Sequence, residues 1–174
     1  MRIAGIVGWH DSGKTTLITT LVNALVDRGY RVSTIKHAHH GFDVDTPGKD
    51  SWKHRASGAT EVMVASSARW ALMHELRTEN EPALAELLAA MSPVDLVLVE
   101  GFKHEKHDKI EVYRAGLADR PIALLDPTVV ALADDGKTKN VPDRVKHLDA
   151  ADPASIADFI EHHWGLERPR KRRA

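Results

Sequence analysis

The stretch GWHDSGKTTL, residues 8–17, decides how this chain folds. It separates Gly8 from Gly13 by four residues and continues with Lys14 and Thr15, which is the phosphate-binding pattern G-x-x-x-x-G-K-[ST]. In such a loop the glycines let the backbone approach phosphates, the lysine neutralises them, and the hydroxyl ligates Mg²⁺. The pattern therefore predicts a site for a nucleoside triphosphate and Mg²⁺. The predicted binding residues are Gly8, Trp9, His10, Asp11, Ser12, Gly13, Lys14, Thr15 and Thr16.

One residue of this loop, Asp11, carries a negative charge where phosphates are expected. The charge does not contradict the pattern, because only the backbone N–H groups of the inner residues must face the phosphates. We expect the Asp11 side chain to point outward, and an inward orientation would weaken triphosphate binding. Its neighbour His10 either contacts the γ-phosphate or faces solvent.

The segments around the loop alternate between strand and helix patterns. RIAGIV (2–7) predicts a buried strand, and the apolar spacing in 14–28 predicts a helix that ends before Gly29. Further strands are expected at 30–36, 60–66, 69–74, 94–100, 109–114, 122–125 and 129–133, and further helices at 49–57, at 84–91 and after Asp152. This order predicts an α/β fold, a P-loop NTPase-type three-layer sandwich with a mostly parallel sheet and an added antiparallel hairpin. We expect one nucleotide-binding domain over 1–164 and a basic, disordered tail over 165–174.

Composition narrows the class of protein. The 174 residues carry a formal net charge of -1 and no cysteine, which leaves no disulfide, no zinc–thiolate site and no overall field for nucleic acid. No apolar run approaches the about 20 residues that span a bilayer, and the chain enters its first strand without a signal-peptide pattern. These features fit a cytoplasmic protein without membrane or nucleic-acid partners. The basic tail is either a solubilising end or an electrostatic contact for RNA or an acidic partner.

Carboxylates that follow strands are the candidates for completing a magnesium site. Glu100 ends the apolar run VDLVLVE, and ligands of open α/β sheets bind beyond the carboxyl ends of strands. Asp43 and Asp45 follow the second predicted strand and either approach the metal or belong to a solvated turn. Glu100, Thr15 and Asp45 are therefore the predicted metal ligands, and Asp45 and Glu100 are the only candidates for a catalytic role.

Three stretches together resemble the MobB family of molybdopterin-guanine dinucleotide biosynthesis adapter proteins. They are GIVGWHDSGKTTL, VSTIKHAHHGFDVDTPGKDSWKHRASGA and LVLVEGFKHEKHDKIEVYR, and the resemblance extends from residue 3 to about 115. It implies a homodimeric protein that binds GTP and Mg²⁺ and has at most weak GTPase activity. The implied partner is the enzyme that attaches GMP to molybdopterin, the molybdenum cofactor guanylyltransferase, together with molybdopterin and molybdoenzymes.

The resemblance also assigns residues. It places Lys14 and its loop at the phosphates and Glu100 at the metal. The family's stretch that begins at the end of the second strand falls on Lys36, His37, His39, His40, Asp43, Asp45 and Asp50. The chain has no N-K-x-D motif for guanine. Asp134, at the end of a predicted strand, is the candidate acceptor for the guanine N1 and N2 groups, with Asp135 as its alternative.

Two other functions remain open on the sequence. Eleven histidines, among them HAHH at 37–40 with His54, His104 and His107, suggest a metallochaperone GTPase for nickel or zinc. The same histidines could instead contact the pterin phosphate. The second alternative is a P-loop kinase or ligase for a small molecule, which would turn over an acceptor without a partner protein.

Overall fold

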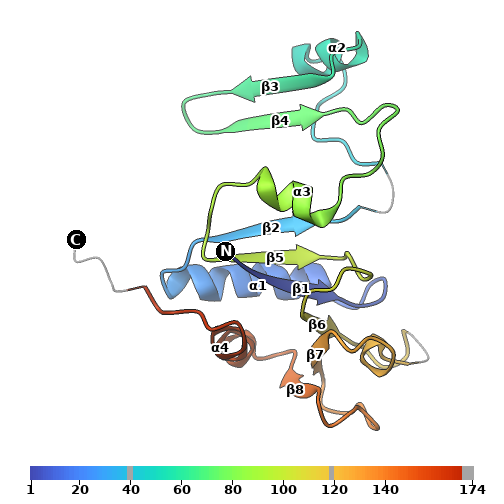
Figure 1. Ribbon diagram of the computed structural model, residues 1–174, viewed down its shortest axis with the longest axis vertical. Helices are drawn as coiled ribbons and strands as arrows, with labels where there is room; N and C mark the ends of the chain where they lie inside the picture. The colour runs from blue at the N-terminus through green and yellow to red at the C-terminus, as the bar shows by residue number, and fades with distance from the viewer. Residues whose placement is uncertain (39–40, 118–119, 170–174) are drawn as a thin grey trace. The chain divides into compact units, whose positions relative to one another are not determined.

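The computed structural model describes residues 1–38, 41–117 and 120–169, whose contacts separate two units (Figure 1). Unit 1 comprises Met1–His37 and Met91–Ala174, and unit 2 comprises Ala38–Ala90. The region expected to form one domain, 1–164, therefore contains two compact units. No helix among the described residues has the length and apolarity needed to cross a membrane.

Unit 1 is built on a six-stranded parallel sheet with the order β2-β5-β1-β6-β7-β8. The strands are β1 (Arg2–Val7), β2 (Val32–Lys36), β5 (Leu96–Glu100), β6 (Lys109–Val112), β7 (Val129–Asp134) and β8 (Lys146–Asp149). The continuous apolar runs of β1 and β5 are almost fully buried, as expected for strands of a parallel sheet. Because all strands run the same way, their carboxyl ends meet at one edge, where the loop after β1 begins.

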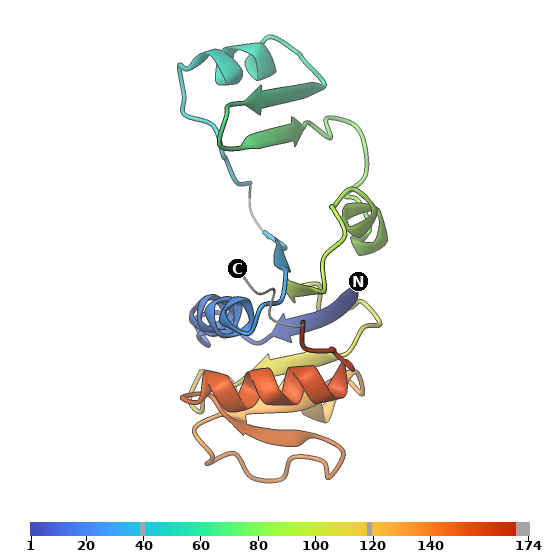
Figure 2. The same ribbon diagram turned by 90° about the vertical axis from the view of Figure 1, so that its left-hand side faces the viewer.

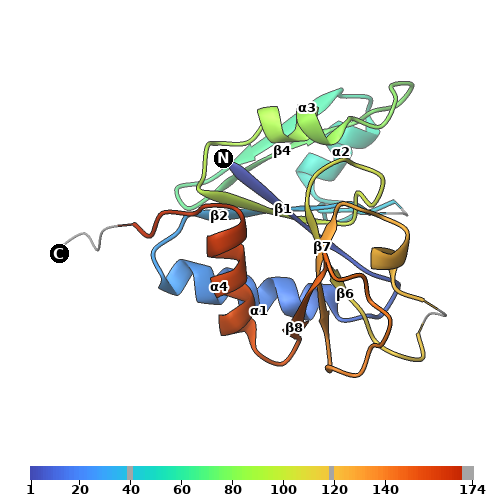
Figure 3. The same ribbon diagram turned by 60° about the horizontal axis from the view of Figure 1, so that its bottom comes forward.

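Two helices cover one face of this sheet. Helix α1 (Lys14–Asp27) packs against α4 (Pro153–His163), and both lie on the same side of the strands (Figures 2 and 3). Helix α4 begins where the Asp152 carboxylate accepts hydrogen bonds from the N–H groups of Ala154 and Ser155. The core between helices and sheet includes Ala4, Ile6, Leu21, Leu25, Leu98, Ile110, Ile156 and Ile160, all fully buried.

The opposite face carries a smaller core of Val7, Ala123, Val129, Leu132 and Val145. It is covered by η1 (Ile122–Leu124), a short 3₁₀ helix. The prediction of a strand at 122–125 is therefore wrong. The buried Glu111 carboxylate of β6 accepts hydrogen bonds from the N–H groups of Ile122 and Ala123, both at 2.8 Å, and this contact holds the segment in a helical turn.

Unit 2 contains α2 (Asp50–Ala56), the antiparallel hairpin β3 (Glu61–Ala65) with β4 (Trp70–His74), and α3 (Leu84–Ala89). The expected hairpin is confirmed, with Met63 opposite Leu72. The Arg55 guanidinium of α2 connects the loop before α2 with the residue that follows β4. It binds Asp43 at 2.7 Å and Asp45 at 3.0 Å in that loop, and Glu75 at 3.2 Å. These ion pairs organise a unit that has few buried apolar side chains.

The beginning of the basic tail is anchored to α4. Arg168 binds the Glu161 carboxylate through two nitrogens, at 3.0 and 2.8 Å. Residues 170–174 lie outside the described part of the chain, so the disorder expected for them stays a prediction.

Candidate phosphate-binding site

The loop after β1 has a backbone that only glycine accommodates at its two ends. Gly8 has a φ of 150°, and a Cβ there would collide with the carbonyl oxygen of Val112 and lie 2.6 Å from Ser12 Oγ. Gly13 has a φ of 99° and caps α1 in the left-handed conformation. The first N–H groups of α1, which have no partner within the helix, therefore open onto the loop. This is the geometry that binds phosphate.

The side chain of Asp11 is exposed at the tip of the loop. Asp11 has a φ of 58°, a conformation that aspartate tolerates better than most residues. Its carboxylate is 80% exposed and lies 2.9 Å from Nδ1 of His10, whose side chain is 94% exposed. The two side chains therefore pair with each other in solvent, while the inner backbone of the loop remains available.

Lysine side chains surround the loop. The ammonium of Lys14 donates to the carbonyl oxygen of Trp9 at 2.7 Å, so the side chain reaches back across the loop in which phosphate would bind. Burial lowers the pKa of Lys14, and the neighbouring charges of Lys103 and Lys36 lower it further, against the opposing effects of Glu100 and Asp11. Cations that destabilise one another in this way attract an anion strongly. The structure thus adds Lys103 to the predicted site.

Lys103 was not among the residues predicted from the phosphate-binding pattern. Its ammonium lies 4.9 Å from the ring centroid of Trp9, a cation–π contact that joins the segment after β5 to the phosphate loop. The only signal in the sequence is its place three residues after the strand-end carboxylate Glu100. A lysine so close to a strand end at the ligand-binding edge is a reasonable phosphate contact.

The two predicted magnesium ligands of unit 1 lie together. Thr15 Oγ1 donates to Glu100 Oε1 at 3.3 Å, although 85 residues separate them. The same carboxylate oxygen accepts from Lys36 Nζ at 3.0 Å, because Lys36 lies opposite Glu100 in the β2–β5 register. A hydroxyl and a carboxylate beside a phosphate loop are the hard oxygen ligands that Mg²⁺ takes with a nucleotide. Thr15 and Glu100 therefore suit Mg²⁺ as ligands. Lys36 would have to leave the Glu100 carboxylate for the metal to bind there.

Asp45 and Asp43 belong to unit 2, where their carboxylates already have partners. Asp45 accepts from Ser51 Oγ at 2.8 Å and from Arg55 Nε at 3.0 Å, and its side chain is only 5% exposed. The Asp43 carboxylate binds Arg55 and accepts from the N–H of Asp45, and these hydrogen bonds lower its pKa. Both residues hold the loop before α2, and a metal-binding role for Asp45 stays a prediction.

The candidate guanine acceptors flank a turn at the end of β7. Asp134 is buried, and its two oxygens accept from the N–H groups of Gly136 at 2.9 Å and Thr138 at 3.1 Å. Asp135 is exposed and binds Lys137 at 2.6 Å. The structure thus gives Asp134 a role in shaping the loop and leaves Asp135 accessible beside it.

The histidines do not gather into one group in the described part of the chain. His39 and His40 lie outside the described residues. His37 stacks obliquely on Phe102 at a centroid distance of 4.8 Å, and His107 is half-buried against Gly5. Within residues 1–38, 41–117 and 120–169, no three His, Asp or Glu side chains are placed to hold a metal ion together. The metallochaperone alternative stays a prediction.

A buried parallel strand that leads through a glycine-bounded loop into α1, with a carboxylate on the adjacent strand, defines a P-loop type of α/β fold. The family model described as MobB, molybdopterin guanine dinucleotide synthesis protein B, matches residues 3–135. The chain belongs to this family.

Individual relatives agree with the family assignment. The chain is 45% identical over 163 residues to the molybdopterin-guanine dinucleotide biosynthesis adapter protein of Escherichia coli, covering 91% of this chain and 90% of that protein. It is 40% identical over 170 residues to the adapter protein of Haemophilus influenzae, covering 93% and 90%. A crystal structure of a MobB homologue from Bacillus stearothermophilus superposes with a TM-score of 0.72 at 26% identity, covering 96% of this chain and all of that one.

Proposed function

We propose that this protein is an adapter in molybdopterin-guanine dinucleotide biosynthesis, which binds GTP with Mg²⁺ and assists the enzyme that joins GMP to molybdopterin. The family membership supports the pathway, and the relatives in E. coli and H. influenzae carry the adapter name. The proposal includes a cytoplasmic location, where such an enzyme and GTP would be available.

The observation that carries the nucleotide part of the proposal is the meeting of Thr15 and Glu100 beside the phosphate loop. Lys14 would move from the Trp9 carbonyl to the β- and γ-phosphates, and the loop N–H groups would bind the remaining phosphate oxygens. Bound Mg²⁺ would supply charge neutralisation at the phosphates. Thr15 and Glu100 would hold it, and Lys36 would be released from Glu100 toward the phosphate anions.

Weak hydrolysis follows from the same arrangement. Glu100 is the carboxylate that contacts Thr15 beside the phosphate loop. When GTP and Mg²⁺ are bound, the Glu100 carboxylate would ligate the metal, and a metal-bound carboxylate is a poor base for activating water. We therefore expect that GTP acts mainly as a ligand that sets the state of the adapter.

A homodimer is part of the proposal. A two-stranded hairpin is marginal on its own, and β3 and β4 expose large apolar side chains in unit 2. Met63, Leu72 and Trp70 share one face of the hairpin, and their exposed fractions are 63%, 45% and 66%. Such a patch is typical of an interface between proteins, and a second copy of this chain would cover it.

A reconstituted reaction tests the adapter role. Purified guanylyltransferase, molybdopterin and Mg²⁺–GTP would be combined with this protein or with Lys14→Ala, and the guanine dinucleotide product measured. We expect the wild-type protein to increase product formation and Lys14→Ala to do so less, with a nucleotide affinity at least about tenfold lower. Equal products with and without the adapter would refute its role. Fast turnover of an acceptor by this protein alone would favour the kinase or ligase alternative.

A further inference from the structure

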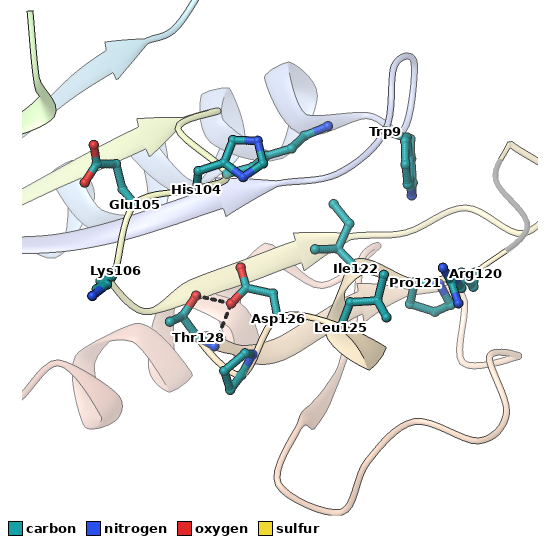
Figure 4. Close-up of a pocket in the computed structure, with 12 residues that line it drawn as sticks. Trp9, His104, Glu105, Lys106, Arg120, Pro121, Ile122, Leu125, Asp126 and Thr128 are labelled. Carbon is teal, nitrogen blue, oxygen red and sulfur yellow. Dashed lines mark hydrogen bonds between the residues drawn. The ribbon is translucent and has the colours of Figure 1, made fainter.

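A pocket of about 690 Å³ lies in unit 1 beside the phosphate loop (Figure 4). It is formed by Trp9, the segment after β5 and the segment around η1. The lining includes Trp9, Lys103, Lys106, Arg120, Ile122 and Leu125. Its volume falls in the range of small-molecule sites, which is about 300–1,000 Å³. The pocket shares only Trp9 and Lys103 with the candidate phosphate-binding site.

The walls of the pocket suit a flat, partly apolar molecule. Trp9 is 43% exposed and Leu125 is 64% exposed, so both present apolar surface that the rest of unit 1 does not cover. In Figure 4 the Trp9 ring and the side chains of Ile122 and Leu125 lie around the same opening. An aromatic ring opposite aliphatic side chains is a surface on which a planar heteroaromatic ring stacks.

Cations at the rim select for negative charge. Lys106 and Arg120 have no hydrogen-bond or ion-pair partner among the residues that the structure describes, and Lys103 contacts only the face of Trp9. The carboxylate of Asp126 is already bound by Thr128 at 2.6 Å and by buried Lys109 at 3.3 Å. Glu105 is the one other acid of the lining, so the free charge of the rim is positive.

The wall that contains η1 is held rigidly. The guanidinium of Arg144 donates to the carbonyl oxygens of Ala123 at 2.7 Å and Val129 at 2.8 Å, with longer bonds to those of Asp126 and Pro127. The Glu111 carboxylate of β6 accepts hydrogen bonds from the N–H groups at the start of η1. A preformed wall lowers the entropic cost of binding a ligand.

We propose that this pocket binds a planar heteroaromatic molecule that carries a phosphate or carboxylate group. This assignment rests on the proposed function, which makes the phosphorylated pterin the ligand. A purine nucleotide shares the same chemistry and is the competing source. Because Trp9 lines the pocket and also belongs to the phosphate loop, the two ligands would lie next to each other and influence each other's affinity, reciprocally.

Direct titration tests the pocket, with 6-carboxypterin as the probe and its fluorescence as the readout. We expect saturable binding to the wild-type protein. Arg120→Ala, which removes one charge-assisted contact, should weaken binding about tenfold. Lys139→Ala is the matched control, because Lys139 is an exposed cation of unit 1 outside the pocket. It should bind the probe as the wild type does. Circular dichroism would verify that both variants are folded.

Three outcomes decide between the possibilities. No binding of 6-carboxypterin, or equal binding to wild type and Arg120→Ala, would overturn the assignment. Displacement of the probe by GMP in Lys14→Ala, whose phosphate loop is weakened, would assign the pocket to a nucleotide and overturn the pterin proposal. GTP binding, measured separately by calorimetry, should be the same in Arg120→Ala and wild type. Its absence from the wild type would refute the proposed function, whatever the probe shows.

Discussion

Glu100 is the residue whose replacement separates metal binding from phosphate binding. Its Oε1 contacts both Thr15 and Lys36, so Glu100→Gln keeps the shape and removes the charge that Mg²⁺ needs. We expect GTP binding with Mg²⁺ to weaken by about tenfold or more, while GDP binding without Mg²⁺ changes little. Calorimetry in both conditions measures the difference. An equal loss in both would show that Glu100 acts through folding.

Guanine selection can be tested at two adjacent residues with different surroundings. We expect a preference for GTP over ATP of about tenfold, which requires polar groups matched to one base. Asp134→Asn should lose that preference together with thermal stability, because the buried carboxylate accepts two backbone N–H groups. Asp135→Asn, at an exposed position, tests base reading without that cost. Competition titrations with both nucleotides decide. Equal GTP and ATP affinities in the wild type would remove the guanine assignment.

At the scale of residues, the sequence predicted correctly those features of the candidate site that depend on local sequence patterns. Gly8, Gly13, Lys14 and Thr15 follow a spacing that has one structural solution, and Glu100 ends an unmistakable buried strand. Lys103 escaped prediction because its role depends on where the segment after β5 meets Trp9, a contact between distant parts of the chain. The pairing of Asp45 with Arg55, only ten residues further along the chain, was not predicted because no local pattern shows how the loop before α2 folds back onto that helix.

At the scale of elements, the Glu111 carboxylate is the anchor of η1. Glu111→Gln would turn an amide N–H₂ toward a backbone N–H that now donates to an oxygen. We expect unfolding free energy to fall by about 1–3 kcal/mol, the cost of an unsatisfied buried polar group. Glu105→Gln, at an exposed position, is the control and should leave stability unchanged. Urea denaturation of both variants measures this, and matching midpoints would contradict the anchoring role.

The same carboxylate explains why one element was mispredicted. IALL at 122–125 has the apolar character of a short buried strand, and nothing local reveals that its N–H groups bind a side chain of β6. Strand β8, with the sequence KHLD, was missed because its three polar residues conceal a strand with one buried side chain, Leu148. Helix α1 and strand β5 were predicted well, because the apolar face of α1 repeats over 14 residues and β5 is a continuous run of buried apolar residues.

At the scale of the whole molecule, oligomeric state is a direct test of the exposed hairpin. We expect the protein to elute as a dimer in size-exclusion chromatography with light scattering, and Trp70→Glu to shift it toward monomer by placing a charge in the patch. Val26→Glu is the matched control, because Val26 is 50% exposed on α1 in unit 1. A monomeric wild type would refute the dimer. Dimers of equal stability in all three proteins would place the interface elsewhere.

The dependence of stability on pH should carry a signature of His107. Burial lowers the pKa of this imidazole, and neither ring nitrogen has a hydrogen-bond partner among the described residues. The unfolded chain therefore takes up the proton more readily, so unfolding free energy should fall as pH drops through the ordinary histidine value of about 6.5. His74 acts oppositely, because Glu61 and Glu79 raise its pKa. Denaturation of wild type and His107→Gln between about pH 7 and 5 isolates the effect. Equal slopes would contradict it.

The register between β2 and β5 has a consequence for how this chain tolerates change. These strands are neighbours in the sheet, with Val32 opposite Leu96 and Lys36 opposite Glu100. In the sequence, however, the whole of unit 2 lies between them. The chain entropy of closing a loop grows slowly, by about 0.6 kcal/mol for each doubling of length. The free energy of forming the sheet therefore depends only weakly on the length of the chain that connects these two strands. A module inserted there could grow, shrink or be exchanged during evolution while the nucleotide scaffold stayed intact.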